Sequence, residues 1–170
     1  MAASTDAPMK PTYNVLFLCT GNSARSIIAE SLLNALGGGR FRAFSAGSHP
    51  KGEVHPLAIE VLSRGGYPTL EARSQSWDEF ARPGAPALDF VITVCDNAAA
   101  ETCPVFPGRP VSAHWGMPDP AAVGGSAADQ RDAFRDTLRE MRRRVQQFTS
   151  LPFGSTDQQA LRGMMQAIAS

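Results

Sequence analysis

Residues that could carry out nucleophilic chemistry lie together near the start of the chain, in the segment CTGNSARS at 19–26. An apolar run at 15–18 precedes it and apolar residues with helical spacing follow it, which predicts a strand, a tight loop and the start of a helix. The N–H groups of such a loop and the positive end of the helix suit a tetrahedral oxyanion. The residues expected to bind that oxyanion are Thr20, Gly21, Asn22, Ser23, Ala24 and Arg25.

Cys19 is the expected nucleophile of this loop. A free thiol has a pKa of about 8.5, and a helix N-terminus and a nearby cation can lower it to about 3.5–7.5. Arg25 would supply the cation and a planar fork that can hold two oxygens, and Ser26 could donate its hydroxyl to the thiolate. The alternative is a buried cysteine that ends a strand, with Arg25 on the surface of the helix.

Two further cysteines could exchange disulfides with Cys19. Cys95 directly follows the apolar run at 90–94, and Cys103 comes later on a loop rich in proline and glycine. Parallel strands end at the same sheet edge, so Cys95 is expected near Cys19, and the three thiols suggest a relay. A continuous helix over 95–103 would separate its ends by about 12 Å. A disulfide needs Cα atoms about 4.4–6.8 Å apart, so this segment must be looped or must unwind.

Simpler explanations of these cysteines stay open. Cys95 could be a small core residue and Cys103 a surface thiol. A zinc site can be drawn from Cys95, Cys103 and His114, but it lacks the closely paired spacing of structural zinc sites. His114 is better explained as a hydrogen-bonded core histidine on an apolar strand.

Asp119 lies between two prolines in HWGMPDP at 114–120, on a loop after the last predicted strand. A carboxylic acid poised over the anion loop could protonate a leaving oxygen, although many Asp-Pro pairs simply form turns. The arginines at 142–144 are expected on the solvated face of a long helix, and His49 and His55 need no special role.

The predicted elements alternate along the chain, which indicates the α/β class with a mainly parallel sheet. The first strand should lie inside the sheet, with its carboxyl end, and therefore Cys19, at the switch point where ligands bind. The strands are predicted at 13–18, 41–46, 90–94 and 111–115, and the helices at 26–36, 56–64, 74–80 and 127–148.

The bulk composition sets the class of protein. The chain has 170 residues, 16 basic and 16 acidic side chains and three cysteines, and it has no apolar stretch of about 20 residues. We expect a monomeric cytoplasmic protein without nucleic-acid or membrane partners. It should comprise a disordered tail at 1–11, a single α/β catalytic domain at 12–151 and a C-terminal extension at 152–170 with a short helix.

The motifs resemble those of the low-molecular-weight tyrosine phosphatase superfamily and, within it, the thioredoxin-coupled arsenate reductases. The resemblance spans about residues 13–150 and rests on CTGNSARS at 19–26, SAG at 45–47, VCDNAAAETCP at 94–104 and HWGMPDP at 114–120. It implies a four-stranded parallel sheet flanked by helices on both faces, and it implies reduction of arsenate to arsenite, with phosphate or sulfate as substrate analogues.

The resemblance also implies roles for the residues of the anion site. Cys19 would attack arsenate, and Arg25 would clamp its oxygens. Asn22 and Ser26 would shape the loop and stabilise the thiolate. Asp119 would be the general acid that helps hydroxide leave.

The resemblance further implies a relay of disulfides. Cys95 would attack next, releasing arsenite and forming a disulfide with Cys19, and Cys103 would then take over Cys95. Thioredoxin would reduce the Cys95–Cys103 bond, so no tightly bound cofactor is expected. Seven residues separate Cys95 from Cys103, one more than in better-known members, and a glutathione–glutaredoxin route stays open.

Some members of this superfamily bind potassium beside the anion loop. Asn22, Glu30 and Ser45 match that site, whereas Ser76 falls where an aspartate would be. We therefore expect at most a weak potassium site and no other metal.

Two other functions compete with arsenate reduction. Hydrolysis of phosphomonoesters or phosphotyrosine would use Cys19, Arg25 and Asp119 without a relay. Phosphotyrosine phosphatases of the superfamily carry aromatic residues after the Asp-Pro pair, where this chain has Ala121 and Ala122. An anion-binding sensor would not need an activated Cys19. The sequence favours the reductase, with weak residual phosphatase activity.

Overall fold

The computed structural model describes residues 12–169, so the tail predicted at 1–11 lies outside the described residues. Strands and helices alternate through the first three quarters of this range, and two helices end it. The elements are β1 (Tyr13–Leu18), α1 (Arg25–Leu36), β2 (Phe41–Ala46), α2 (Pro56–Arg64), the 3-10 helix η1 (Trp77–Phe80), β3 (Phe90–Thr93), α3 (Asp96–Ala100), β4 (Val111–His114), the 3-10 helix η2 (Pro120–Ala122), α4 (Ala127–Thr149), the 3-10 helix η3 (Phe153–Ser155) and α5 (Gln158–Ile168).

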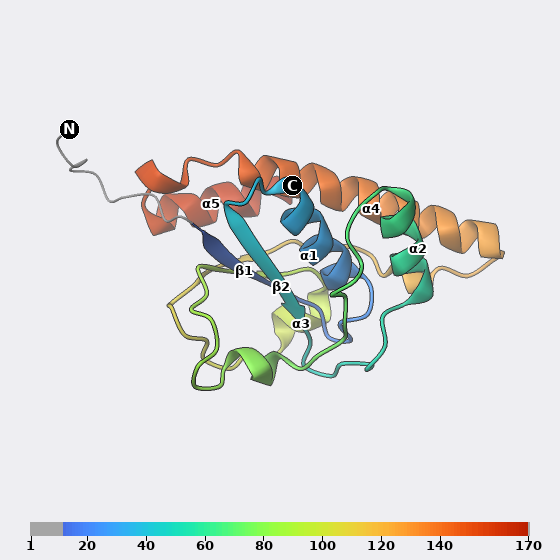
Figure 1. The fold of residues 1–170 in the computed structure, drawn as a ribbon, viewed down its shortest axis with the longest axis horizontal. Helices are drawn as coiled ribbons and strands as arrows, with labels where there is room; N and C mark the ends of the chain where they lie inside the picture. The colour runs from blue at the N-terminus through green and yellow to red at the C-terminus, as the bar shows by residue number, and fades with distance from the viewer. Residues whose placement is uncertain (1–11, 170) are drawn as a thin grey trace.

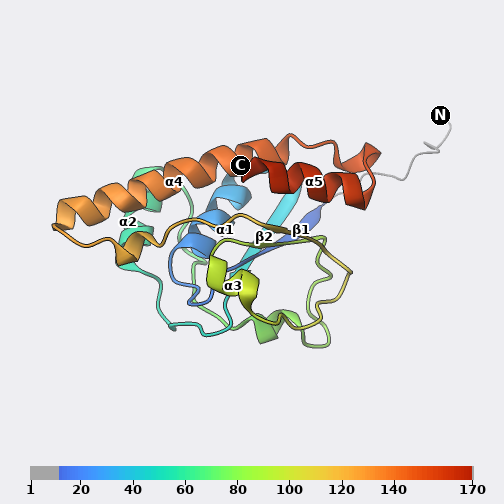
Figure 2. The ribbon, with the colours of Figure 1, turned by 180° about the vertical axis from the view of Figure 1, so that it is seen from behind.

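The four strands form one parallel sheet in the order β2-β1-β3-β4, which confirms the predicted α/β class and the interior place of β1. Helices α1, α2, α4 and α5 lie on one side of the sheet, and α3 and η1 lie on the other (Figures 1 and 2). Because all strands run the same way, the loops after β1, β3 and β4 meet at one edge. Those loops carry Cys19, Cys95 and Asp119.

The core forms around β1, whose residues Leu16, Phe17 and Leu18 are fully buried. Such a strand is covered on both faces and therefore reads as a continuous apolar run. The apolar stripe predicted for the long helix is present in α4, where Phe134 and Phe148 are among the fully buried residues. Each such side chain contributes roughly 1.5–3 kcal/mol on burial, so β1 and α4 hold the site's edge of the sheet on a rigid base.

Several predicted boundaries are corrected by the structure. The strands predicted to end at Val94 and Trp115 end one residue earlier, and the helix predicted at 74–80 is only the four-residue η1. The short helix α3 was not predicted. Its N-cap is Cys95, whose sulfur accepts the Ala98 N–H at 3.4 Å.

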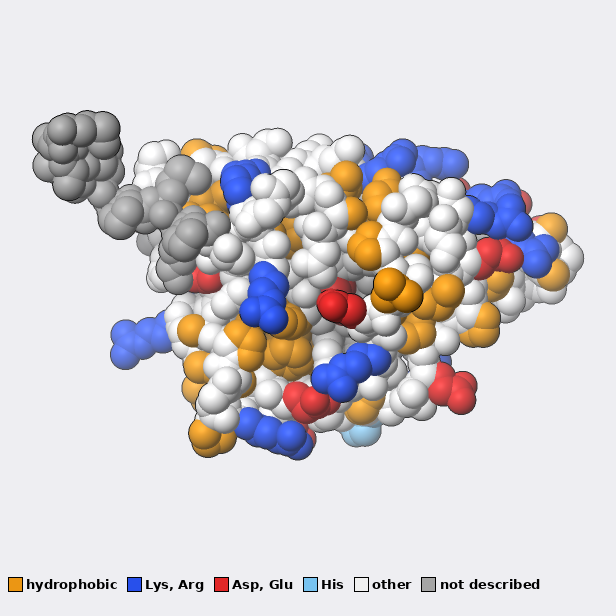
Figure 3. Space-filling view, viewed as in Figure 1, with side chains coloured by type: hydrophobic (Ala, Val, Ile, Leu, Met, Phe, Trp, Pro, Cys, Tyr) orange, Lys and Arg blue, Asp and Glu red, His pale blue; other side chains and the backbone are white. Residues whose placement is uncertain are grey.

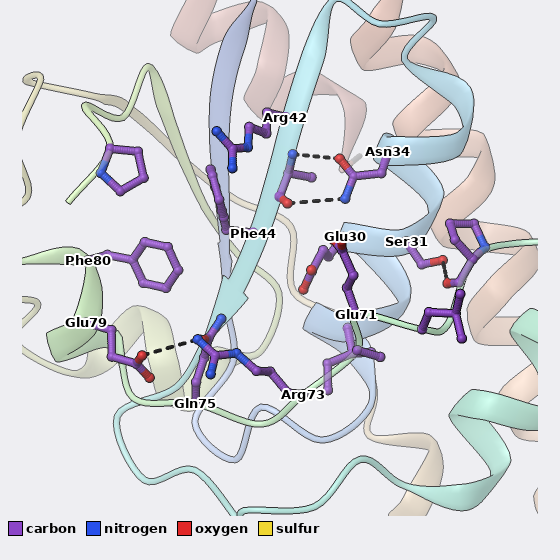
Figure 4. A pocket seen from close by; sticks show the side chains of 16 residues that line it. Glu30, Ser31, Asn34, Arg42, Phe44, Glu71, Arg73, Gln75, Glu79 and Phe80 are labelled. Atoms are coloured by element: carbon purple, nitrogen blue, oxygen red, sulfur yellow. Dashed lines mark hydrogen bonds and ion pairs between the residues drawn. The ribbon is translucent and has the colours of Figure 1, made fainter.

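Side-chain amides cover both edge strands of the sheet. On β2, Asn34 of α1 donates to the Ala43 carbonyl at 3.2 Å and accepts the Ala43 N–H at 2.9 Å (Figure 4). On β4, Gln166 of α5 makes the same pair of bonds to the backbone of His114, at 2.7 and 3.0 Å. Helix α5, which lies in the stretch where a C-terminal helix was predicted, thus covers an edge that would otherwise be open to another strand.

Arg144 contradicts the prediction of a solvated arginine run. It is only 7% exposed, and its Nη1 donates to the Trp115 carbonyl at 2.9 Å while its Nε donates to Glu140 at 2.7 Å. The prediction failed because the helical pattern does not reveal that the backbone carbonyls after β4 accept a hydrogen bond from α4. No helix within residues 12–169 has the length and apolarity needed to cross a bilayer.

Candidate active site

The anion loop joins the end of β1 to the start of α1, as predicted. Ala24, the N-cap of α1, makes no side-chain capping bond, and the first helical turn carries no acidic residue. Asn22 adopts a positive φ of 43°, a conformation that asparagine tolerates better than most residues. The positive end of the helix is therefore left to attract an anion.

Asn22 and Ser26 hold the shape of this loop. Both side chains are fully buried. The Asn22 amide donates to the Ser26 hydroxyl at 2.8 Å and accepts the Gln75 N–H at 2.8 Å. These bonds tie the loop to α1 and to the segment before η1, so its strained turn is fixed by partners on two sides.

A cavity of about 230 Å³ opens over the anion loop. Arg25 reaches into it, with Nη1 donating to the Met117 carbonyl at 2.8 Å and Nη2 lying 3.8 Å from a carboxylate oxygen of Asp119. The predicted nucleophile, clamp and acid are thus brought together. The cavity is lined by Cys19, Thr20, Gly21, Ser23, Ala24, Arg25, His49, Lys51, Asn97 and Asp119.

The sulfurs of Cys19 and Cys95 are hydrogen-bonded to each other, and both residues are at least 95% buried. That bond and burial raise the pKa of Cys19, although Arg25 and the Gly21 N–H act in the opposite direction. The same bond, helped by the N–H groups of Thr20 and Ala98, lowers the pKa of Cys95 to about 5. The expectation that the helix N-terminus and Arg25 lower the pKa of Cys19 is therefore wrong for this arrangement.

The physical reason is the local structure around Cys95. As the N-cap of α3 it accepts two backbone N–H groups at 3.4 Å, from Thr20 and Ala98. These donors stabilise a negative sulfur. These contacts favour the negative charge on Cys95 and the proton on Cys19.

Cys103 lies outside this cluster. It is exposed on the loop after α3, and burial of its sulfur together with the Glu101 charge raises its pKa. The structure brings two of the three predicted relay cysteines together and leaves the third at the surface.

His114 is hydrogen-bonded as predicted, but it lies on the edge strand with 35% of its side chain exposed rather than in the core. Its Nε2 lies 2.8 Å from Asp96 and its Nδ1 2.7 Å from the Thr93 hydroxyl. Among residues 12–169, no three His, Cys, Asp or Glu side chains are grouped so that they could hold a metal ion.

The residues that match a potassium site already have protein partners. Asn22 accepts the Gln75 N–H, the Ser45 carbonyl accepts the Gln75 amide at 2.8 Å, and the Ser45 hydroxyl donates to Glu30 at 2.5 Å. Ser76 caps η1 by accepting the Asp78 N–H. A cation at the Ser45 carbonyl would face the amide group of Gln75, so these residues do not fit potassium as they are arranged.

A larger cavity, of about 940 Å³, lies between α1, β2 and η1, away from the cysteines (Figure 4). Its rim carries both signs of charge, with Arg73 and Glu79 paired at 3.3 Å, and the same face of the molecule mixes charged and apolar side chains (Figure 3). Gln75 Oε1, which lines this cavity, is the one buried side-chain oxygen or nitrogen of the described residues that has no hydrogen-bond partner. None of its lining residues is a cysteine, in contrast to the cavity over the anion loop.

Sequence reasoning missed four residues around the anion loop. His49 and Lys51 follow β2, and their N–H groups donate to the Thr20 and Gly21 carbonyls at 2.9 and 3.0 Å. The Lys51 side chain covers Gly21, where a Cβ would lie 3.2 Å from its Cε. Asn97 and Glu101 come from the segment between the other two cysteines. Their place beside the anion loop becomes visible only in the folded structure, where loops distant in sequence come together.

The comparison of the chain with known protein families matches residues 14–160 to the low molecular weight phosphotyrosine protein phosphatases. The chain belongs to this family. Within the low molecular weight phosphatase family, it is 34% identical over 134 residues to an arsenate reductase of Halalkalibacterium halodurans, covering 79% of this chain and 93% of that protein.

Solved structures of the low molecular weight phosphatase fold agree. The arsenate reductase from Archaeoglobus fulgidus is 27% identical with a TM-score of 0.63, covering 81% of this chain and 99% of that one. A thioredoxin-dependent arsenate reductase of Corynebacterium glutamicum is 28% identical with a TM-score of 0.53, covering 80% of this chain and 63% of that one.

Proposed function

We propose that this protein reduces arsenate to arsenite, with Cys19 as nucleophile and Cys95 and Cys103 as the thiol–disulfide relay. The hydrogen bond between the sulfurs of Cys19 and Cys95, beside the anion loop, supports this reaction most directly. Hydrolysis needs one thiol only. A second buried thiol in contact with the first serves a reaction that ends in a disulfide. The reductases among the relatives support the same choice.

The first step is attack of the Cys19 sulfur on arsenic. As the sulfur–arsenic bond forms, the Cys19 proton passes along the hydrogen bond to Cys95, and one arsenate oxygen leaves as water with a proton from Asp119. Arg25 and the N–H groups at the start of α1 hold the remaining oxygens.

The second step reduces arsenic. The sulfur of Cys95 attacks the sulfur of Cys19 and gives up its proton to an oxygen on arsenic. The sulfur–arsenic bond breaks, its electron pair stays on arsenic, and arsenite leaves. Cys103 then attacks Cys95, so that the disulfide moves to Cys95–Cys103 and Cys19 departs as a thiolate. An external dithiol reduces the last disulfide.

Thioredoxin is the proposed reductant. Cys103 is exposed, and Val105 beside it is 91% exposed, so a partner can reach the thiol across an apolar contact. The Corynebacterium glutamicum relative is described as thioredoxin-dependent, which supports this choice over glutaredoxin. Reduced thioredoxin is available in the cytoplasm, where we place the protein.

Phosphomonoester hydrolysis remains the second candidate because the same loop suits phosphate. The cavity over the anion loop carries no Phe, Tyr or Trp that could stack on a phosphotyrosine ring. We therefore expect hydrolysis to be slow and without preference for aromatic esters.

The test measures arsenite formation with thioredoxin and its reductase, and with glutathione and glutaredoxin, alongside p-nitrophenyl phosphate hydrolysis. Cys19→Ser should abolish both reactions, whereas Cys95→Ser should abolish reduction and keep hydrolysis. Continued multiple-turnover reduction by Cys95→Ser would exclude the relay. Hydrolysis without any arsenite formation by the unaltered protein would establish the phosphatase instead.

A further inference from the structure

Glu101 lies in the sequence between Cys95 and Cys103, and its side chain contacts residues of other segments. Cys95 and Cys103 are called the outer cysteines below. Its carboxylate accepts the Thr20 hydroxyl at 3.0 Å and the Ser48 hydroxyl at 2.5 Å, and lies 3.4 Å from Nδ1 of His49. Three quarters of the side chain is buried. The partners belong to the anion loop and to the loop after β2, so this one side chain ties the segment 96–103 to the catalytic site.

Thr20 links this tie to Cys95. The Thr20 N–H donates to the Cys95 sulfur at 3.4 Å, and the Thr20 hydroxyl lies 3.8 Å from it. That hydroxyl has one proton, and Glu101 accepts it. The carboxylate therefore fixes the residue that contacts Cys95 on one side, while the helix α3 fixes Cys95 on the other.

The tied segment keeps the outer cysteines apart. Cys95 is 3% exposed and caps α3, whereas Cys103 is exposed beyond the far end of that helix. The five residues of α3 rise about 7.5 Å, and Glu101 after them is extended. A disulfide needs Cα atoms about 4.4–6.8 Å apart, so we expect the segment to fold back before Cys95 and Cys103 can be joined.

We propose that Glu101 is a positioning residue that holds the segment 96–103 against the anion loop while the cysteines are reduced, and that it is released when the Cys95–Cys103 disulfide forms. The inference rests on the proposed relay. In that step the Cys103 thiolate forms a bond to the Cys95 sulfur, the Cys19–Cys95 bond breaks, and the electron pair leaves on Cys19. Exchange among the three sulfurs consumes no other oxidant.

The negative charge of Glu101 has a second effect on the same step. Together with burial, it raises the pKa of Cys103 and keeps this sulfur as the less reactive thiol. Departure of the carboxylate removes that repulsion. Release of the segment and activation of Cys103 then occur together.

The test isolates the outer pair in a Cys19→Ser protein, equilibrated in buffers of reduced and oxidised glutathione. Glu101 stabilises only the reduced form, so adding Glu101→Ala should raise the equilibrium constant for forming the Cys95–Cys103 disulfide by about tenfold. Glu101→Gln, which keeps one acceptor, should have a smaller effect. Asp132→Asn, an exposed carboxylate on α4 that changes the net charge equally, should have none.

A second readout separates positioning from general loss of structure. In a protein whose only cysteine is Cys103, Glu101→Gln should move the pH profile of alkylation by iodoacetamide to lower pH, with the thermal midpoint unchanged.

The proposal is overturned if Glu101→Ala leaves the glutathione equilibrium within twofold of its parent, if alkylation is unchanged, or if the Cys95–Cys103 disulfide does not form at any ratio. Arsenate takes no part in these measurements. Failure of arsenate reduction by the unaltered protein would therefore be seen separately.

Discussion

Cys19 donates a hydrogen bond to the sulfur of Cys95, so the two thiols cannot ionise independently. The nucleophile of the anion loop is thereby kept protonated by the residue proposed to displace it later. A negative charge is better stabilised on the Cys95 sulfur than on the Cys19 sulfur, because the backbone N–H groups of Thr20 and Ala98 donate to Cys95.

Replacing Cys95 by Ser should make Cys19 more acidic. The thiolate partner that raises the Cys19 pKa is gone, whereas Arg25 and the Gly21 N–H still lower it. In a Cys103→Ser background, alkylation of Cys19 by iodoacetamide at neutral pH should accelerate by about tenfold or more, because the rate follows the thiolate fraction. An unchanged pH profile would show that Cys95 does not control this proton.

Glu30 should make the protein less stable as the pH rises. Burial raises the pKa of its carboxyl from 4.5 to about 7, against the effect of the Ser45 hydroxyl. Between these values the unfolded chain releases the proton and the folded chain keeps it. The free energy of unfolding should therefore fall from about pH 4.5 to about pH 7, by up to about 3 kcal/mol, and then level off.

Urea denaturation of Glu30→Gln checks that prediction. The variant keeps an acceptor for Ser45 but does not ionise, so it should lack this decline and exceed the original protein in stability above pH 7. Glu53→Gln, an exposed carboxylate, is the control and should keep the decline. Equal slopes for Glu30→Gln and the original protein would contradict the assignment.

Arg144 should matter for both stability and catalysis. Its guanidinium donates to the Trp115 carbonyl, and the loop that follows places Met117 against Arg25 and carries Asp119. Arg144→Met leaves a buried carbonyl without its donor, which should lower the free energy of unfolding by about 1–3 kcal/mol. It should also lower kcat/KM for arsenate.

Arg142→Met in the same helix is the matched control. Arg142 is exposed, and its contact with Tyr67 is long at 3.5 Å, so its replacement should leave both quantities nearly unchanged. Equal losses of unfolding free energy for the two substitutions in chemical denaturation would show that the hydrogen bond from Arg144 to the Trp115 carbonyl does not stabilise the fold.

Replacing Gly47 beside the anion loop should lower both the stability of the protein and its affinity for oxyanions. A Cβ at this position would lie 2.4 Å from the carbonyl oxygens of Cys19 and Thr20, so the backbone must shift. Gly47→Ala should cost about 1–3 kcal/mol of stability and reduce the rise in thermal midpoint that phosphate or arsenate produces. Gly163→Ala on α5, where a Cβ meets open space, should instead stabilise by up to about 1 kcal/mol.

Much of the site was predictable because its parts are local. The apolar runs that end at Leu18 and near Val94 identify β1 and β3, and the residues after them must share one sheet edge when the strands are parallel. Cys19 and Cys95 were expected together on that ground, and they are in contact. The potassium match, by contrast, depended on residue types alone and did not anticipate the Gln75 amide on Ser45.

Periodicity and neighbours along the chain are enough to predict the α/β class, the order of the elements and the loop that joins Cys19 to Arg25. The proton shared by the two thiols, the burial of Arg144 and the contact between Glu101 and Thr20 depend on how the chain folds. Each of these depends on separations of about 3–4 Å between segments far apart in sequence. Hydrogen bonds and desolvation change steeply over such distances, and no pattern of residue types encodes them.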